Sequence, residues 1–377
     1  MLGFVSLFMD VSSELIHSLL PVFMVTSLGA TALMVGVVEG VAEATALIVR
    51  VFSGTLSDWL GRRKGLTVLG YGLGAISKPL FALALTVHWV FVARFMDRIG
   101  KGIRGAPRDA LIADLTPPEI RGAAYGLRQS LDTVGAFVGP LLAIGLMVLW
   151  AGDFRAVFWF AVIPAVFSVL ILVFGVHEPG VGRARSRPAS PVEWWSLSEF
   201  GAGYWWIVVA GGVFTLARFS EAFLILRAQQ LGLADTFAPL VLVIMNVVYA
   251  LSAYPFGRLA DRMSHGKLLA AGLAVLLLSD LVLAQASGLA AVVAGLVLWG
   301  LHMGMTQGLL AAMVAGAAPA HLRGTAFGFF NLVGGVAMLI ASVLAGLLWD
   351  QLGAAVTFYA GAAFSVLALA LLILRRD

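Results

Sequence analysis

The chain has 377 residues, of which 61% are hydrophobic and only 12% are charged, and its mean hydropathy is +0.99. These values exclude an ordinary soluble globular protein and indicate an integral membrane protein. The net charge of +4 does not indicate a nucleic-acid ligand, because the basic residues follow the predicted topology, and the absence of cysteine excludes disulfides and thiolate chemistry.

Twelve stretches of the chain are long and apolar enough to cross a membrane as helices, since one crossing needs about 20 apolar residues. They are centred near residues 15, 45, 76, 97, 135, 165, 215, 248, 276, 302, 335 and 364. The sequence therefore predicts an all-α membrane protein with twelve transmembrane helices. The first stretch has no basic leader and carries Asp10 and Glu14, so we expect no cleaved signal peptide.

Lysine and arginine are concentrated in the loops on one side of the predicted bundle. That side collects Arg62, Arg63, Lys64, Arg108, Arg121, Arg183, Arg185, Arg187, Arg258, Arg262, Lys267, Arg323, Arg375 and Arg376. The other side has little beyond Arg155 and Arg227. By the positive-inside rule the rich side is cytoplasmic, so we expect a multi-pass protein of the inner (plasma) membrane with both termini in the cytoplasm.

A segment rich in Pro, Ser and Arg interrupts the hydrophobic pattern after residue 176. We interpret it as a cytoplasmic linker at 177–201 between two six-helix domains, at 1–176 and 202–377.

Two short segments recur across this linker at nearly constant spacing. The first pair is GTLSDWLGRRKGL at 54–66 and GRLADRMSHGKLL at 257–269, an offset of 203. The second is PPEIRGAAYG at 117–126 and PAHLRGTAFG at 319–328, an offset of 202. Two parallel halves with a site between them are typical of secondary transporters.

The loop between the second and third spans resembles the hallmark loop of the major facilitator superfamily. The match consists of Gly54, Asp58, Gly61, Arg62, Arg63 and Lys64, and the second copy keeps Gly257, Asp261 and Arg262. The fourth span resembles the family's Arg-plus-Gly-x-Gly pattern through Arg94, Gly100 and Gly102. This resemblance covers the whole chain and implies two six-helix halves, related by a pseudo-two-fold axis, that alternate access to a central site.

The fifth span resembles the Gly-Pro motif of the drug/proton antiporter branch through Gly135, Gly139 and Pro140. Leu142 and Ala143 stand where that branch normally has a glycine pair. The resemblance implies export coupled to protons.

The hallmark loop also has a physical interpretation. Asp58, at a helix end, can accept hydrogen bonds from Arg62 and from the N-terminal amides of a neighbouring helix, which makes a latch for the closed cytoplasmic side. Alternatively, the basic run only anchors the loop and sets the topology. The predicted cytoplasmic gate comprises Gly54, Asp58, Gly61, Arg62, Arg63, Asp261 and Arg262.

Asp10, Glu14 and His17 recur at helical spacing in the first span and therefore share one helix face. A charge in lipid is expensive, so this face must meet protein or water. Low dielectric and neighbouring carboxyls favour the protonated form of such a group, which makes Glu14 the first candidate for proton coupling. The alternative is a structural salt bridge to a basic stripe on the fourth span. That stripe consists of Arg94, Arg98 and Lys101.

Further carboxyls lie in other spans. Glu39 and Glu43 are one turn apart in the second, and Asp132 is one turn from Arg128 in the fifth, where mutual neutralisation is the alternative interpretation. The proton-coupling candidates are Glu14, Asp132, Glu43, Asp10 and Glu39.

The second half carries fewer charges, and we expect its amide and aromatic side chains to shape a substrate pocket. The substrate-cavity candidates are His17, Arg94, Asp97, Arg98, Lys101, Arg128, Arg218, Glu221, Asn246, Tyr249, His302 and Gln307. Alternatively, Arg218 and Glu221 only neutralise each other, and His302 is a packed polar group.

Several side chains have the ligand types that suit a divalent cation. They are Met9, Asp10, Glu14, His17, His302, Met303 and Met305. No short metal-binding motif accompanies them, and methionines in so apolar a chain mostly pack the bundle. We therefore predict no metal site and no cofactor, with the proton gradient as the energy source.

The predicted function is proton-coupled export of a small molecule by alternating access. The alternatives are proton-coupled uptake of an anionic metabolite or metal chelate, and transport of a divalent metal cation. A membrane enzyme is the rival from another class, but the loop near 177–200 has no recognisable catalytic arrangement, so we expect no enzyme. We expect a monomer whose partners are a small-molecule substrate, protons and the lipid bilayer, with no nucleic acid.

Overall fold

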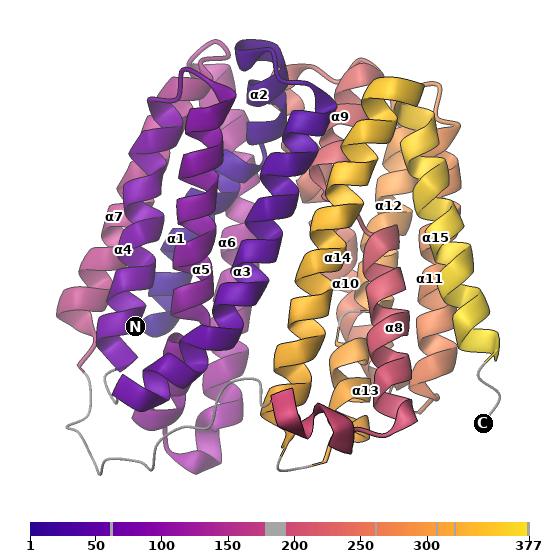
Figure 1. Cartoon of the computed structure of the whole chain (residues 1–377). Coiled ribbons are helices and arrows are strands. Elements are labelled where there is room, and N and C mark those ends of the chain that lie inside the picture. Colours follow the sequence, from indigo (N-terminus) through magenta and orange to yellow (C-terminus); the bar gives the residue numbers. More distant parts are fainter. Residues whose placement is uncertain (61–62, 178–193, 261, 307, 320–321, 375–377) are drawn as a thin grey trace. The chain divides into compact units, whose positions relative to one another are not determined.

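A computed structural model describes residues 1–60, 63–177, 194–260, 262–306, 308–319 and 322–374 (Figure 1). Over these ranges the chain forms fifteen α-helices and three short 3-10 helices, with no strand. A helix satisfies every backbone polar group within itself, which is what an apolar segment needs inside a bilayer. The prediction of an all-helical membrane protein is confirmed.

The helices group into two compact units. The first contains Met1–Phe23 and Val41–Pro191, and the second contains Met24–Gly40 and Val192–Asp377. Two helices, α2 (Leu20–Leu28) and α3 (Ala32–Leu60), contribute residues to both units.

The first unit is a bundle whose helices run side by side (Figure 1). Besides its parts of α2 and α3, it contains α1 (Leu2–His17), α4 (Arg63–Ala82), α5 (Val87–Leu115), η1 (Pro118–Ile120), α6 (Arg121–Leu149) and α7 (Phe154–Gly175). In this bundle α1 packs against α6 and α7, and α4 packs against α5 and α7. Val5, Met9, Tyr71 and Leu111 are completely buried between these helices.

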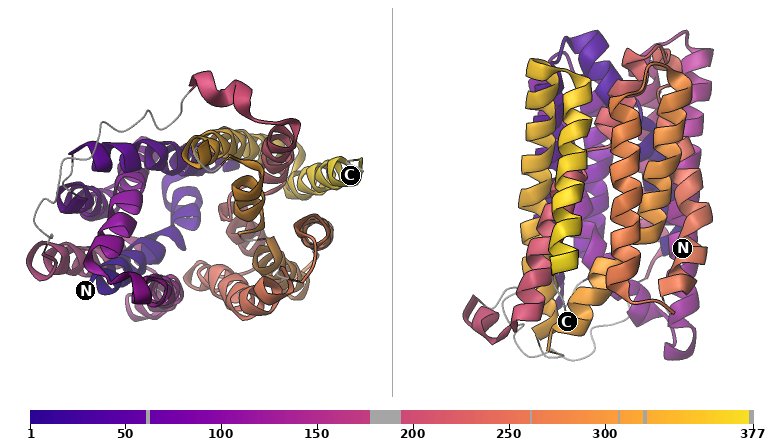
Figure 2. Two further views of the ribbon diagram at one scale, coloured as in Figure 1. Left: turned by 90° about the horizontal axis from the view of Figure 1, so that it is seen from below. Right: turned by 90° about the vertical axis from the view of Figure 1, so that its right-hand side faces the viewer.

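The second unit is built in the same way. It contains η2 (Trp194–Glu199), α8 (Ala202–Ala217), α9 (Ala222–Gln230), η3 (Asp235–Phe237), α10 (Leu240–Ala260), α11 (His265–Ala284), α12 (Leu289–Thr306), α13 (Leu309–Ala317), α14 (Arg323–Leu352) and α15 (Ala354–Leu374). Helix α11 packs against α12 and α15, and the right-hand view of Figure 2 shows α15 in yellow beside it.

Within the described ranges, ten helices or helix pairs have the length and hydropathy of membrane spans. Helices α4 and α5, of 20 and 29 residues, are also long enough but carry charged residues in their interiors. These two helices pack against each other, so their charges meet inside the first unit. Together they account for the twelve spans predicted from the sequence.

The internal repeat is visible in the helices themselves. Corresponding helices begin 202 positions apart: α4 and α11 at 63 and 265, α5 and α12 at 87 and 289, α6 and α14 at 121 and 323. Gly29 and Gly232 turn the chain after α2 and α9 with φ of 67° and 101°, a conformation that glycine adopts without strain.

The first span of each half is broken near its middle. Helix α1 ends at His17 and α2 begins at Leu20, whereas α8 ends at Ala217 and α9 begins at Ala222. The starts of α2 and α9 are again 202 positions apart. Helices interrupted at corresponding positions of two halves expose backbone groups inside the membrane, which marks a binding region in secondary transporters.

Candidate functional site

Four of the five predicted proton-coupling carboxylates lie together in the first unit, each beside a basic or imidazole group. The N···O distances range from 3.0 to 3.9 Å. The side chains of Asp10, Glu14, Glu43 and Asp132 are 26%, 22%, 33% and 17% exposed. These carboxylates are therefore half-buried, where both a counter-charge and water can reach them.

On α1, the predicted polar face is present. Glu14 Oε2 lies 3.3 Å from Nδ1 of His17, one turn further along the helix. Asp10 Oδ1 lies 3.9 Å from the guanidinium of Arg104 on α5, which also stacks over the Tyr71 ring at 4.7 Å. The salt bridge to the fourth span that we considered for α1 therefore exists, but it reaches Arg104, one turn beyond the predicted basic stripe.

Two further pairs involve α3 and α6. Arg98 on α5 is buried and its guanidinium lies 3.2 Å from Glu43 Oε1. Arg128 lies 3.0 Å from Asp132 Oδ2 on the same helix and 3.6 Å from Asp109 on α5. The mutual neutralisation considered for Arg128 and Asp132 is thus observed. Glu39, the fifth candidate, is buried in the second unit.

One almost completely buried ion pair includes a residue that the sequence analysis missed. Lys78 Nζ on α4 donates to Asp97 Oδ1 on α5 at 2.7 Å and to Ser13 Oγ on α1 at 3.0 Å. The two charged side chains are 1% and 4% exposed. The available signal was the lysine itself, in the apolar run ISKPLFA, because an ionisable residue inside a span is a functional candidate by default.

Lys101 differs from the other cations of α5. Its side chain is exposed, and no residue in the described part of the chain forms an ion pair with it within 4.0 Å. It lies within electrostatic range of Asp10, Glu14 and Glu43. The face that carries the paired carboxylates therefore also presents an ammonium group to solvent.

The Gly-Pro motif brings α6 against the two carboxylates of α1. A Cβ on Gly135 would lie 3.0 Å from the Asp10 Cβ, and one on Gly139 would lie 2.9 Å from the Glu14 Cβ and from the Val11 carbonyl oxygen. Only glycine permits this approach, because any side chain would collide with the α1 backbone. The motif thus fixes the position of the acidic face.

The predicted gate lies only partly in the described residues. Gly61, Arg62 and Asp261 fall outside them, as does the side chain of Asp58. Arg63 begins α4 and pairs with Asp114 near the end of α5, donating also to the Ala110 carbonyl at 3.0 Å. A Cβ on Gly54 would lie 3.4 Å from the Ala106 Cβ of α5, and Arg262 is exposed. The gate remains a prediction.

In the second unit, the predicted substrate-cavity residues are more scattered. Arg218 lies in the break between α8 and α9, 5.9 Å from the Phe214 ring centre and within electrostatic range of Glu221 and Tyr249. Asn246 is half-buried on α10. His302 is completely buried, with Nδ1 2.9 Å from the Gly272 carbonyl oxygen. Gln307 lies outside the described residues.

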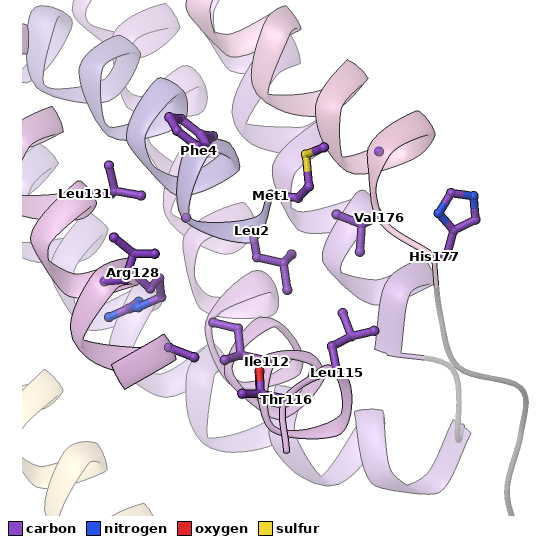
Figure 3. Close-up of a pocket in the computed structure, with 14 residues that line it drawn as sticks. Met1, Leu2, Phe4, Ile112, Leu115, Thr116, Arg128, Leu131, Val176 and His177 are labelled. Carbon is purple, nitrogen blue, oxygen red and sulfur yellow. The ribbon is translucent and has the colours of Figure 1, made fainter. Parts of the chain in front are cut away.

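One pocket of about 440 Å³ opens in the first unit (Figure 3). Its walls come mainly from Leu2, Ile112, Leu115 and Val176, with the Arg128 side chain at one edge. The pocket is largely apolar, and none of the four carboxylates lines it. It touches the charged face, which consists of these carboxylates, their partners and Lys101, only through Arg128, the partner of Asp132.

Among the described residues, no group of three or more His, Asp or Glu side chains is placed to hold a metal ion. Any substrate of the charged face would therefore meet ion pairs and an ammonium group.

Comparison with known proteins gives the family. The model of the Major Facilitator Superfamily matches residues 2–227 and 207–377. An uncharacterized MFS-type transporter of Methanocaldococcus jannaschii is 30% identical over 373 residues, covering 97% of this chain and 92% of the relative. Two partial matches are a probable galactarate/D-glucarate transporter of Escherichia coli, 32% identical over 40% of this chain and 34% of the relative, and a multidrug resistance protein of Photorhabdus laumondii, 29% identical over 42% and 39%.

The fold agrees with that assignment. The crystal structure of a nucleoside transporter matches with a TM-score of 0.83 at 12% identity, covering 100% of this chain and 99% of the other. The chain is a multi-pass membrane transporter and belongs to the Major Facilitator Superfamily.

Proposed function

We propose that this transporter exports a small molecule in exchange for protons, across the inner membrane, with both of its termini in the cytoplasm. One observation carries the proposal: four half-buried carboxylates of the first unit each lie within 4 Å of a cationic or imidazole partner. A carboxylate that can exchange its basic partner for a proton is a coupling element, because each exchange changes the charge of the face.

Glu14 is the best placed of the four. Its partner His17 is the last residue of α1, directly before the helix break, so a movement of the break changes the distance between the two groups. An imidazole beside a carboxylate can accept or donate a proton, so this pair can pass a proton in either direction. Asp10, Glu43 and Asp132 are the further proton sites of this proposal.

The similarity to a multidrug resistance protein supports export, as does the Gly-Pro motif that holds the acidic face against α6. Lys101 supports a second candidate function. An exposed ammonium beside partly neutralised carboxylates is suited to bind an anionic group, and one partial relative is a probable transporter of galactarate and D-glucarate, which are dicarboxylates. The second candidate is therefore proton-coupled uptake of an organic anion.

Proton movement in energised inside-out vesicles tests the proposal. Ethidium, D-glucarate and Mn²⁺ represent the cationic, anionic and metal classes. Export predicts that one of them causes protons to leave the lumen, and that Asp58→Asn removes this signal. Uptake predicts no lumenal alkalinisation but accumulation of D-glucarate in right-side-out vesicles with an acidic exterior. Substrate movement without any proton movement in either orientation contradicts the proposed coupling.

A further inference from the structure

The second unit contains a carboxylate that the charged face does not include. Asp280 lies in the interior of α11, and its relative exposure is 0%. Neither of its carboxylate oxygens has a hydrogen-bond partner in the described part of the chain. A buried carboxylate is normally paired or hydrogen-bonded, because an isolated charge in a low-dielectric interior is very costly.

The Asp280 carboxylate lies against α15, near a cluster of aromatic rings. A Cβ on Gly361 of α15 would lie 2.8 Å from Asp280 Oδ2 and 3.0 Å from Cε1 of Phe219. The Phe219 ring lies 5.7 Å from the ring of Trp299 and 5.5 Å from that of Phe358. Phe219 itself belongs to the break between α8 and α9, so Gly361 brings the broken helix and the Asp280 carboxylate to one place on α15.

None of the ionisable groups on the described helices around α11 donates a hydrogen bond to Asp280. On α12, His302 Nδ1 lies beside the Gly272 carbonyl, two turns from Asp280, and its Nε2 has no hydrogen-bond partner among the described residues. On α9, the Arg227 guanidinium donates to the Leu283 and Ala284 carbonyls at the end of α11.

The remaining ionisable groups of the described residues near α11 also form no ion pair with Asp280. In the α8–α9 break, Arg218 and Glu221 act on each other electrostatically, and on α15 the Tyr359 side chain is 44% exposed. Lys267 is exposed and lies more than three turns before Asp280 on α11. No basic side chain of the described residues forms an ion pair with Asp280.

The internal repeat explains how this position differs from its counterpart. Asp280 lies 202 positions after Lys78, and Trp299 lies 202 positions after Asp97, on helices that also begin 202 positions apart. The first half therefore fills this site with an ion pair whose charges neutralise each other. In the second half, an aspartate stands at the position of the lysine and a tryptophan at the position of the aspartate, so this negative charge has no ion-pair partner among the described residues.

We propose that Asp280 is a proton-binding site of the second half, covered by Phe219 of the broken helix and opened when that break moves. A proton neutralises the carboxylate without needing any further ligand. Sodium would need several additional oxygen ligands, and no hydroxyl or amide of the described residues donates a hydrogen bond to either carboxylate oxygen. The inference deepens the proposed proton coupling, and its role in transport rests on that proposal.

Infrared spectroscopy of the purified full-length protein in detergent tests the proposal, because a protonated carboxyl has its own carbonyl stretching band. We expect such a band at neutral pH, with loss of one component in Asp280→Asn. Asp153→Asn is the matched control, since Asp153 caps α7 and its oxygen accepts from the Arg155 and Ala156 amides. An Asp280→Asn spectrum equal to that of the wild type overturns the proposal.

A second variant keeps the test valid if Asp280→Asn does not fold. Gly361→Ala places a methyl group against Asp280 Oδ2 and should shift the band without removing it. An unshifted band overturns the proposal. The proposal is also overturned if the Asp280 band is absent and Na⁺ raises the melting temperature of the wild type but not of Asp280→Asn. That result would assign the site to sodium. The infrared measurement needs no substrate, so a failure of the vesicle experiment alone contradicts the proposed function and not this site.

Discussion

The ammonium group of Lys78 and the carboxylate of Asp97 lie 2.7 Å apart between α4 and α5, almost completely shielded from solvent. Ser77 Oγ donates to the same carboxylate oxygen at 3.3 Å, and Ser13 Oγ accepts from the ammonium at 3.0 Å. The pair therefore joins α1, α4 and α5 within the first unit. Asp97 is also the neighbour in sequence of Arg98, which forms an ion pair with Glu43.

Removing one member of this pair should be strongly destabilising. Lys78→Met leaves the Asp97 charge buried without its main partner, at a cost of about 3–5 kcal/mol. Replacing both residues, as Lys78→Met with Asp97→Leu, should recover most of that loss. Thermal unfolding in detergent, followed by tryptophan fluorescence, measures the effect. Lys64→Met, which removes a hydrogen bond to the Val173 carbonyl, is the control. A Lys78→Met melting temperature equal to that of the control would show that the pair is not structural.

The contact between α6 and α1 should be equally specific. Gly139→Val forces a side chain against Glu14 and the α1 backbone, and such overpacking costs about 1–3 kcal/mol. Gly145→Val on the same helix is the matched control, because a Cβ there meets no atom within 4 Å. Transport and melting temperature should fall in the first variant and stay near wild type in the second. Equal effects of the two substitutions would mean that the glycine motif does not position the acidic face.

The sequence predicted the helices and most of the charged face because charges in a span are rare and helical spacing assigns them to a face. Asp10, Glu14 and His17 lie together as expected. Lys78 was missed because its span reads as apolar on average, and Asp280 is not among the predicted site residues because no nearby residue in sequence marks it. Partners in a bundle come from other helices, so no single segment identifies them.

The break between α8 and α9 was also beyond sequence reasoning. Residues 218–221 contain neither glycine nor proline, the usual causes of an interrupted helix. Arg218 leaves helical geometry with φ −106° and ψ 77°, while Phe219 packs between Trp299 and Phe358. The break therefore depends on tertiary packing, which the local sequence does not encode.

A carboxylate of the second unit holds the start of α3. Asp350 of α14 accepts from the Ala32 and Leu33 amides at 3.0 and 2.9 Å, so it caps that helix. Asp350→Ala should destabilise the first turn of α3 by about 1 kcal/mol. This corresponds to a roughly five-fold larger population in which that turn is open. Because the chain has no cysteine, thiol labelling of Val35→Cys, a buried position, reports this opening. Asp350→Asn keeps a capping oxygen and should label near the wild-type rate; equal rates in Asp350→Ala and wild type would contradict the cap.

Lys101 should matter only for an anionic substrate. If D-glucarate is transported, Lys101→Gln should raise its KM by about 10–100-fold, the range expected for a lost charge-assisted hydrogen bond of about 1.5–3 kcal/mol. Lys101→Arg keeps the charge and should recover most of the affinity. Uptake of radiolabelled D-glucarate at several concentrations measures the effect, and an unchanged KM in Lys101→Gln removes this residue from the substrate site.

The most direct test of proton coupling uses purified protein in liposomes loaded with a pH-sensitive dye, with the membrane potential clamped. Whichever of ethidium, D-glucarate or Mn²⁺ moves protons in wild type is then tested with Glu14→Gln. The account predicts proton movement at least about ten-fold slower in this variant, a loss of at least about 1.4 kcal/mol in the coupled step, while exchange of the same compound across the membrane continues. Transport by the wild type with no proton movement, or wild-type proton movement in Glu14→Gln, would contradict it.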